Sequence, residues 1–276
     1  MSGQNPSLRD LIEHRVALGL GVTLLRGAQA TAVARQMGCD WLFIDLEHGL
    51  YSIAEAGEIC LGAAWAGVTP IVRSKIDDLP SAARLLDNGC GGIVVPRVRN
   101  ESEARTIVKY LRTAPLGQRG MGGSGLGFER GRLGHAEGRE AIDRRLMLVA
   151  TIEDPEGVAN VDRIASVEGI DALLLGASDL SFEYGVGGQI EDPRIWDAAR
   201  AIAAACRNHR RFFGAGGIQS PQHIADCVDL GARLILTGMD HGFLSSALAD
   251  RVTAFRAVCT RPPSQALTDI QAVTRS

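Results

Sequence analysis

The chain has few of the features that mark membrane, nucleic-acid-binding or secreted proteins. Its 276 residues contain no apolar run of about 18 residues, so no membrane span is expected. The net charge of −3 and the pI of about 6.1 leave no basic stripe for a nucleic acid. Residues 1–15 carry acidic side chains and lack the apolar centre of a signal peptide, so we expect a cytoplasmic protein.

Cysteine and lysine are also sparse. The six cysteines form no Cys-x-x-Cys pair, a pattern that is typical of reduced thiols in a cytoplasmic protein of this length. The sequence contains two lysines, Lys75 and Lys109, and only Lys75 lies near the end of a predicted strand. Chemistry through a lysine Schiff base is therefore weakly supported.

Apolar residues make up 46% of the chain and recur as eight short runs separated by helical patterns. Strands are predicted at 16–25, 40–46, 69–74, 91–98, 146–152, 172–175, 212–216 and 234–237. Helices are predicted at 8–15, 28–38, 52–67, 80–88, 102–112, 155–167, 192–210, 221–230 and 242–258.

Eight strand–helix units predict a single (β/α)8 TIM barrel over residues 1–260, followed by a polar tail at 261–276. A doubly wound open sheet is the main alternative. It would usually carry a Gly-rich dinucleotide-binding turn after the first strand, and LLRGAQA at 24–30 does not match that pattern.

One long stretch, residues 113–140, breaks the alternation of strands and helices. It is rich in glycine and arginine and has little apolar periodicity. A loop of this length inside a compact domain is usually functional or disordered. We interpret it as an active-site lid rather than a domain linker, because the strand–helix pattern resumes unchanged after it.

Polar residues follow the predicted strands at the point where each apolar run ends. The stretch DWLFIDLEHG at 40–49 is the richest example, because a buried strand leads directly into charged side chains. Active sites of parallel barrels lie at the carboxyl ends of the strands, so we expect these side chains to share one rim. They are Asp45, Glu47, His48, Arg73, Glu153, Asp154, Ser178, Asp179, Ser181, Asp240 and His241.

Glu153 and Asp179 are the candidate metal ligands. Two carboxylates, completed by substrate oxygens and waters, suit Mg²⁺ or Mn²⁺, whereas zinc more often takes His or Cys. The alternative is that each carboxylate caps the helix that follows it. We favour that alternative for Asp154, because Pro155 suits a first helical turn.

His48 can act as a general base or a hydrogen-bond donor, and Asp45, three residues earlier, can orient its imidazole. The alternative is a loop histidine that bonds the backbone. Arg73 can clamp a carboxylate or an enolate oxygen. The alternative for Arg73 is a structural salt bridge with Asp45 or Glu47.

At these residues the sequence resembles the HpcH/HpaI aldolase family, the metal-dependent pyruvate aldolases of the phosphoenolpyruvate/pyruvate barrel superfamily. The resemblance runs from about residue 16 to residue 258. The motifs that carry it are FIDLEHG at 43–49, PIVR at 70–73, LLDNGCGGIVVPRV at 85–98, QRG at 118–120, and IED with VEGIDALLLGASDLS within 152–181.

The resemblance implies a role for each catalytic residue. Glu153 and Asp179 match the two metal ligands, and Arg73 matches the arginine that contacts the pyruvate or enolate oxygen. His48 matches a histidine that is paired with an aspartate at the position of Asp45. His48 is then the candidate base for the C4 hydroxyl proton of the substrate.

The resemblance also assigns residues around the substrate. The backbone amides of Ser178 and Asp179 match those that hold the pyruvate carboxylate. Thr151, assigned to substrate binding, stands where members usually carry glutamine. Asp87, which the sequence alone suggests is a solvated helix-end residue, matches an acidic residue contributed by a neighbouring subunit. Glu47 is either a partner of metal-bound waters or a structural ion pair.

The implied reaction cleaves or forms 4-hydroxy-2-oxo acids, giving pyruvate or a related 2-oxo acid and an aldehyde through a metal-bound enolate. The implied cofactor is Mg²⁺ or Mn²⁺, with Co²⁺ as an alternative. The implied assembly is a dimer-based homo-oligomer, in some members a hexamer, in which helix eight is often exchanged between subunits. The expected partners are small molecules, without nucleic acid or membrane.

Three other functions stay open. An oxaloacetate decarboxylase would use the same metal-enolate chemistry. A malyl- or citramalyl-CoA-type lyase would usually bring a longer, more basic tail than the one here, which holds two arginines. A non-catalytic metabolite-binding protein would not need the whole set of candidate catalytic and metal-binding residues.

Overall fold

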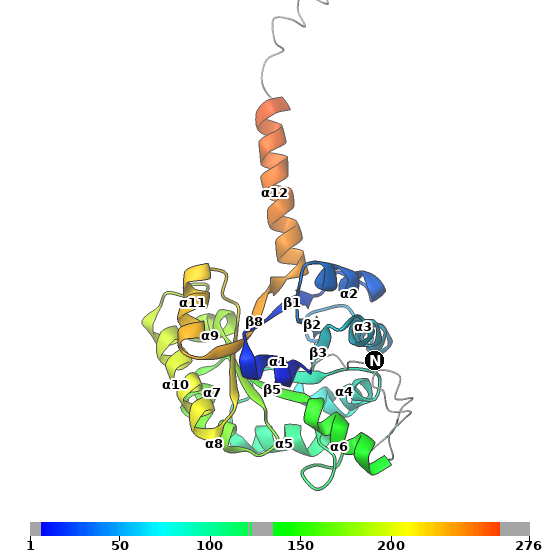
Figure 1. Ribbon diagram of the computed structural model, residues 1–276. Helices are drawn as coiled ribbons and strands as arrows, with labels where there is room; N and C mark the ends of the chain where they lie inside the picture. Colours follow the sequence, from blue (N-terminus) through cyan, green and yellow to red (C-terminus); the bar gives the residue numbers. More distant parts are fainter. Residues whose placement is uncertain (1–6, 121, 123–134, 260–276) are drawn as a thin grey trace, which may run out of the picture. The chain divides into compact units, whose positions relative to one another are not determined.

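Figure 1 shows the structure, a computed structural model that describes residues 7–120, 122 and 135–259. The predicted tail at 261–276 and residues 121 and 123–134 of the predicted lid lie outside the described residues. Residues 135–145 form a helix, so the predicted loop at 113–140 extends too far at its end. This helix was missed because its sequence, HAEGREAIDRR, has little apolar periodicity.

The eight predicted strands form a closed, all-parallel barrel in sequence order, with β8 pairing back to β1. The prediction of a (β/α)8 barrel is therefore confirmed. The strands are β1 (Ala17–Val22), β2 (Trp41–Asp45), β3 (Thr69–Arg73), β4 (Gly92–Val95), β5 (Met147–Ile152), β6 (Ala172–Gly176), β7 (Phe212–Gly216) and β8 (Ala232–Met239).

Between residues 27 and 229, helices alternate with the strands and lie around the barrel (Figure 1). Those of the first half are α1 (Leu8–His14), α2 (Gly27–Gln36), α3 (Ile53–Ala66), the 3₁₀ helix η1 (Ile76–Asp78), α4 (Leu79–Leu86), α5 (Glu101–Leu111) and α6 (His135–Arg145). The second half has α7 (Pro155–Ala159), α8 (Val161–Ser166), α9 (Ala177–Glu183), α10 (Pro193–His209), α11 (Pro221–Asp229) and α12 (Asp240–Cys259).

Two details differ from the predicted helices. The helix expected at 155–167 is broken at Asn160 into α7 and α8. A short helix, α9, directly follows β6, where no helix was predicted. By contrast, α3 begins where the helix at 52–67 was predicted, and a capping box forms there: Ser52 and Glu55 exchange backbone and side-chain hydrogen bonds.

The interior of the barrel is filled by side chains at every second position of the strands. These include Trp41 and Phe43 on β2, Ile71 on β3, Val149 on β5 and Leu174 on β6. Leu8 and Ile12 of α1 belong to the same cluster, so α1 closes the amino-terminal end of the barrel. The same alternation determines which residues at the carboxyl ends of the strands also point into the barrel.

The β1–β8 seam is held by one buried carboxylate. Asp240, which follows β8, accepts hydrogen bonds from the backbone N–H groups of Thr23, Leu24 and Leu25 at 2.8–3.0 Å. Burial opposes ionisation of Asp240, but these N–H groups outweigh it and lower its pKa. The loop that follows β1 is thereby tied to the end of β8.

The contacts divide the chain into two units, Met1–Asp240 and His241–Ser276. The second unit contains almost all of the 20-residue helix α12, whose large apolar side chains are exposed. They are Phe243, Leu244, Leu248, Val252, Phe255 and Val258. None of the helices in the described part of the chain is both long enough and apolar enough to cross a bilayer.

A buried ion cluster lies at the amino-terminal end of the barrel. The carboxylate of Asp171, just before β6, accepts from the guanidinium groups of Arg112 and Arg9 and from the N–H of Leu148. Asp171 and Arg112 are both nearly inaccessible to solvent. Removing one member of a buried pair leaves the other charge without compensation, which is more damaging than losing a surface pair.

We expect Asp171→Ala to lower the free energy of unfolding by about 3–5 kcal/mol, because Arg112 loses its buried counter-charge and the Leu148 N–H loses its acceptor. Urea unfolding followed by circular dichroism measures this change. The control is Asp162→Ala, which removes an exposed pair with His209 and should cost less than about 1 kcal/mol. Equal losses in the two variants would contradict a stabilising role for the buried cluster.

Candidate active site

Asp45 and Arg73 end neighbouring strands and are paired in register. Both continue the inward alternation, from Phe43 on β2 and from Ile71 on β3. Arg73 donates two hydrogen bonds to the Asp45 carboxylate, Nε to Oδ1 at 2.9 Å and Nη2 to Oδ2 at 2.7 Å. Burial opposes ionisation of Asp45, but the bonds and charge of Arg73 outweigh it and lower the pKa of the carboxyl.

The two residues that follow β2 lie beside this pair. Glu47 approaches Arg73, with Oε2 3.4 Å from Nη1. Asp45 also accepts from the backbone N–H groups of Glu47 and His48. The imidazole of His48 is two-thirds exposed, and its Nε2 lies 3.9 Å from Glu47 Oε2. The Asp45 carboxylate thus contacts the His48 backbone, and the carboxylate nearest the imidazole is Glu47.

Glu153 and Asp179 follow the paired strands β5 and β6, and Asp179 is near enough for its charge to affect the pKa of Glu153. Glu153 follows Val149 and Thr151 on the inward side of β5 and is almost fully buried. Asp179 lies in the first turn of α9 and is partly exposed. The lack of a side chain at Gly176 leaves space for the Glu153 carboxylate, because a Cβ there would lie 2.5 Å from Glu153 Oε2.

The pKa of Glu153 is raised to about 7. Burial is the largest cause, and the nearby charge of Asp179 adds to it. The charge of Arg73 and the N–H of Arg97 act in the opposite direction but do not cancel the shift. A carboxylate that is this costly to ionise gains a great deal from a cation placed beside it.

Two hydroxyl side chains lie close to these carboxylates in the sequence. Thr151 Oγ1 is buried and has no hydrogen-bond partner among the described residues, so it is available to a ligand. Ser178 is the second residue of α9, and its Oγ donates to the carbonyl of Gly217 at 3.3 Å. The backbone N–H groups of Ser178 and Asp179 belong to the first turn of α9, where helical N–H groups lack intrahelical partners.

Sequence reasoning missed Arg97 and Glu183 at this rim. Arg97 follows β4, and its N–H donates to Glu153 Oε1 at 2.9 Å. Its guanidinium donates to Glu183 Oε1 at 2.9 Å and lies 4.0 Å from Asp179 Oδ1. The signal was available in the sequence, because Arg97 stands directly after an apolar strand in VPRV, as the other rim residues do.

Asp154 and Asp87 lie apart from the two carboxylates. Asp154 caps α7 by accepting from the N–H of Gly157 at 2.7 Å, which confirms the capping interpretation. Asp87 follows α4, at the amino-terminal end of the barrel, and pairs with Arg119 at 3.1 Å. Within one chain Asp87 therefore holds Arg119 of the QRG motif and lies at the end of the barrel opposite Glu153.

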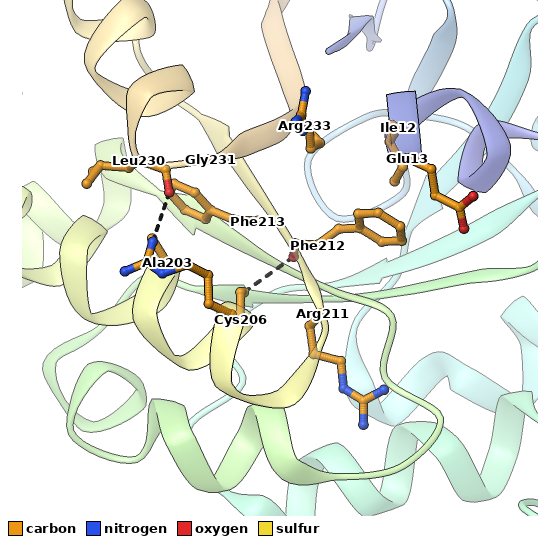
Figure 2. A pocket seen from close by; sticks show the side chains of 11 residues that line it. Ile12, Glu13, Ala203, Cys206, Arg211, Phe212, Phe213, Leu230, Gly231 and Arg233 are labelled. Carbon is orange, nitrogen blue, oxygen red and sulfur yellow. Dashed lines mark hydrogen bonds between the residues drawn. The ribbon is translucent and has the colours of Figure 1, made fainter. Parts of the chain in front are cut away.

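A hollow of about 270 Å³ also lies at this amino-terminal end, at the start of β7 and β8 (Figure 2). Phe212 and Cys206 line it, and the thiol donates to the Phe212 carbonyl at 3.4 Å. Arg211 at its edge is bonded to the carbonyls of Ala165 and Val167. None of the predicted site residues lines this hollow, so it is separate from the rim that carries the carboxylates.

The rim fits a hard divalent cation. Glu153 and Asp179 supply carboxylate oxygens, and the raised pKa of Glu153 shows that positive charge is under-supplied there. Among the described residues no group of three His, Cys, Asp or Glu side chains converges on one point. A site with two protein carboxylates would therefore be completed by waters and substrate oxygens, as is common for Mg²⁺.

Known proteins are similar to this chain over most of its length. The sequence model for "HpcH/HpaI aldolase/citrate lyase" matches residues 24–247. A 4-hydroxy-4-methyl-2-oxoglutarate aldolase of Hapsidospora irregularis is 33% identical over 84% of this chain and 87% of its own. A 2-keto-3-deoxy-L-rhamnonate aldolase of Escherichia coli strain HS is 29% identical over 92% and 94% of the two chains.

Solved structures share the fold. The HpcH/HpaI aldolase from Desulfitobacterium hafniense DCB-2 has a TM-score of 0.83 at 24% identity, covering 93% of this chain and 97% of its own. The citrate synthase SbnG has a TM-score of 0.80 at 26% identity, covering 92% and 98%.

A closed parallel barrel with charged residues gathered at the carboxyl ends of its strands defines a barrel enzyme. The chain belongs to the HpcH/HpaI aldolase/citrate lyase family, as the match over residues 24–247 shows. The resemblance seen in the sequence is therefore confirmed, and with it the class: an aldolase-type carbon–carbon lyase.

The pKa of Glu153 predicts how the metal-free protein responds to pH. Its folded-state value of about 7 exceeds the ordinary 4.5, so the folded state keeps a proton that the unfolded state releases. Stability therefore falls as pH rises from 4.5 to 7, by roughly 3 kcal/mol in all. In EDTA at pH 8, Glu153→Gln should recover most of that loss, while still accepting the Arg97 N–H.

Urea unfolding at pH 4.5 and pH 8 measures this effect, and the gain should nearly vanish at pH 4.5. The control is Glu168→Gln, an exposed carboxylate whose replacement should leave the pH dependence unchanged. If Glu153→Gln were no more stable than the parent at pH 8, ionisation of the buried Glu153 would not destabilise the folded protein as expected.

Proposed function

We propose that the enzyme cleaves or forms 4-hydroxy-2-oxo acids, with pyruvate or a related 2-oxo acid and an aldehyde as the other side of the reaction. The observation that carries the proposal is the meeting of Glu153 and Asp179 beside Arg73 and Thr151 on one rim. The relatives support it, because the names of both describe aldolases that act on 2-oxo acids.

Glu153 and Asp179 would hold the divalent cation, Mg²⁺ or Mn²⁺, with Co²⁺ as an alternative. When bound, this cation supplies Lewis acidity toward the keto oxygen of the substrate. A structure whose name includes a citrate lyase beta subunit with magnesium shares this fold at 14% identity. The choice of Mg²⁺ rests mainly on the oxygen donors of this chain.

Arg73 and His48 would act on the two oxygens whose charge changes. Arg73 is locked in place by Asp45 and holds a positive charge near Glu153, where negative charge develops on the keto oxygen. His48 is exposed at the rim and would accept the proton of the C4 hydroxyl as the C3–C4 bond breaks. Glu47 lies between Arg73 and His48 and would orient the imidazole.

The substrate carboxylate would bind at the start of α9, to the N–H groups of Ser178 and Asp179, with Thr151 Oγ1 beside it. By the resemblance, Thr151 stands where family members usually carry glutamine. This change would alter the wall of the site and leave the carboxylates and Arg73 in place. The specificity for the aldehyde can therefore differ from that of the relatives.

The metal-loaded enzyme should exchange the methyl protons of pyruvate in D₂O, because deprotonation of pyruvate needs no aldehyde. Proton NMR measures the exchange with Mg²⁺, Mn²⁺ or Co²⁺, and EDTA should stop it. Glu153→Ala should weaken metal binding about 100-fold or more, measured by calorimetry, while the barrel stays folded by circular dichroism.

Exchange that is absent with every metal would contradict the aldolase mechanism. Retained metal affinity in Glu153→Ala would contradict the ligand assignment alone. Asp154→Ala is the matched control, because this neighbouring carboxylate caps α7 and should leave metal affinity unchanged. The two measurements thus separate the chemistry from the identity of the ligands.

We also propose a dimer-based homo-oligomer in a reducing compartment such as the cytoplasm. Four of the six thiols are buried and all six are free. The exposed apolar side chains of α12 support association, because six large apolar groups on one 20-residue helix are costly to leave in water. A second copy of the chain is the partner that the resemblance implies, through exchange of this helix.

Replacing Leu248 and Phe255 together by glutamate should reduce the oligomer to smaller species, because both side chains are more than half exposed on α12. Light scattering coupled to size exclusion measures the mass. The control is the pair Trp65→Glu and Met37→Glu, residues at least as exposed, which lie on α3 and at the end of α2. A wild-type monomer, or an unchanged mass in the α12 variant, would contradict this assembly.

A further inference from the structure

Arg97 adopts a backbone conformation that an arginine rarely takes. Its φ is +52°, in the left-handed region, and Arg210 at the end of α10 is the only other described non-glycine residue with positive φ. Arg210 ends a long helix, where this conformation is common. Arg97 ends no helix, and strain of this kind persists where the surrounding structure requires it, often at functional sites.

The left-handed turn lets one residue serve both carboxylates of the candidate metal site. The N–H of Arg97 reaches Glu153 Oε1, while its side chain reaches over Asp179 to Glu183. Glycine would adopt this turn at lower cost and give the same N–H. The presence of arginine therefore indicates that the guanidinium itself is used.

The two arginines of the rim differ in how fully they are engaged. Arg73 donates two hydrogen bonds to Asp45, lies close to Glu47 and is largely buried. Its charge is therefore already neutralised by carboxylates of the protein. Among the residues that the structure describes, Arg97 makes one side-chain hydrogen bond, to Glu183, and its side chain is 41% exposed. A guanidinium carries five N–H donors, so Arg97 retains donors for a ligand.

The ion pairs at the rim show which pair a substrate anion can replace. Arg73 neutralises Asp45 and Glu47, and a divalent cation would neutralise Glu153 and Asp179. Glu183 is then the carboxylate left to Arg97. Both members of the Arg97–Glu183 pair are about 41% exposed, and an exposed pair of this kind is weak and easily replaced by another anion.

We propose that Arg97 is a specificity-determining residue that binds a second carboxylate on the substrate, at the end remote from the 2-oxo acid group. Binding exchanges Glu183 for this substrate carboxylate, which matches the planar guanidinium with two parallel hydrogen bonds. The enzyme thereby favours acceptors that carry a carboxylate over neutral ones. This inference rests on the proposed function, since it presumes that the 2-oxo acid group binds beside Glu153 and Asp179.

The test compares two 2-oxo acids of equal length. 2-Oxoglutarate carries the second carboxylate and 2-oxopentanoate carries a methyl group in its place. Calorimetry with the Mg²⁺-loaded full-length protein should show that 2-oxoglutarate binds about tenfold more tightly or better, as expected of a charge-assisted bidentate pair. Arg97→Met should bring the ratio of the two dissociation constants close to one, and Arg97→Lys should restore part of it.

Glu183→Gln should move the ratio in the opposite direction, because it removes the anion that competes for Arg97. A merely structural role of Arg97 would not predict opposite shifts from the two sides of one ion pair. Arg99→Met is the matched control, since Arg99 lies two residues along, is equally exposed and is paired with Asp154. Its ratio should equal that of the wild type.

The ratio of the two dissociation constants also controls for a general loss of binding, because both acids need the metal and its two carboxylate ligands equally. A wild-type ratio near one, or an unchanged ratio in Arg97→Met, overturns the role of Arg97 and leaves the proposed function standing. If neither acid binds and pyruvate shows no proton exchange, the proposed function itself is wrong.

Discussion

The cost of burying the Glu153 carboxylate is the constraint on which the rim depends. Glu153 is inward-facing by strand parity, walled by neighbouring strands and close to Asp179, so its ionised form has few favourable contacts. Arg73 and the Arg97 N–H reduce the penalty without removing it. A buried carboxylate whose pKa is raised in this way supports the proposal that the rim binds a dication.

Charge at the rim is divided between groups that are fixed and groups that can change partners. The pair of Asp45 with Arg73 is buried, bidentate and registered between two hydrogen-bonded strands, so it acts as a rigid part of the wall. The pair of Arg97 with Glu183 is exposed and joined by one bond. A rigid charged pair suits a chemical step that is the same for every substrate, whereas an exchangeable pair suits discrimination between substrates. Both kinds of pair lie on the same rim of this barrel.

The sequence predicted what depends on local pattern. Eight apolar runs predicted the barrel, and the helical pattern at 52–67 predicted α3, because both signals are short in range. Positions just after strands predicted which residues reach the rim. The choice of partners was not predictable, because Asp45 could bond either Arg73 or His48 until the twist of β2 against β3 fixed the distances.

Long-range and weakly patterned features were missed for similar reasons. The Asp171 cluster joins residues more than 160 positions apart, and no local signal links Arg9 with Asp171. α9 is only seven residues long and follows its strand without a loop, so its apolar period is too short to detect. Arg97 had the right position, but its left-handed backbone, which sends the side chain toward Asp179, is a property of the folded chain.

The carboxylate of Asp240 has a consequence for the order in which the chain is completed on the ribosome. Strands β5 and β6, which bring Glu153 and Asp179 together, are synthesised long before Asp240. The seam between β1 and β8, and the loop at Thr23 to Leu25, gain their buried acceptor only when Asp240 has left the exit tunnel. The acidic half of the rim can therefore be assembled on a nascent chain whose ring is still open.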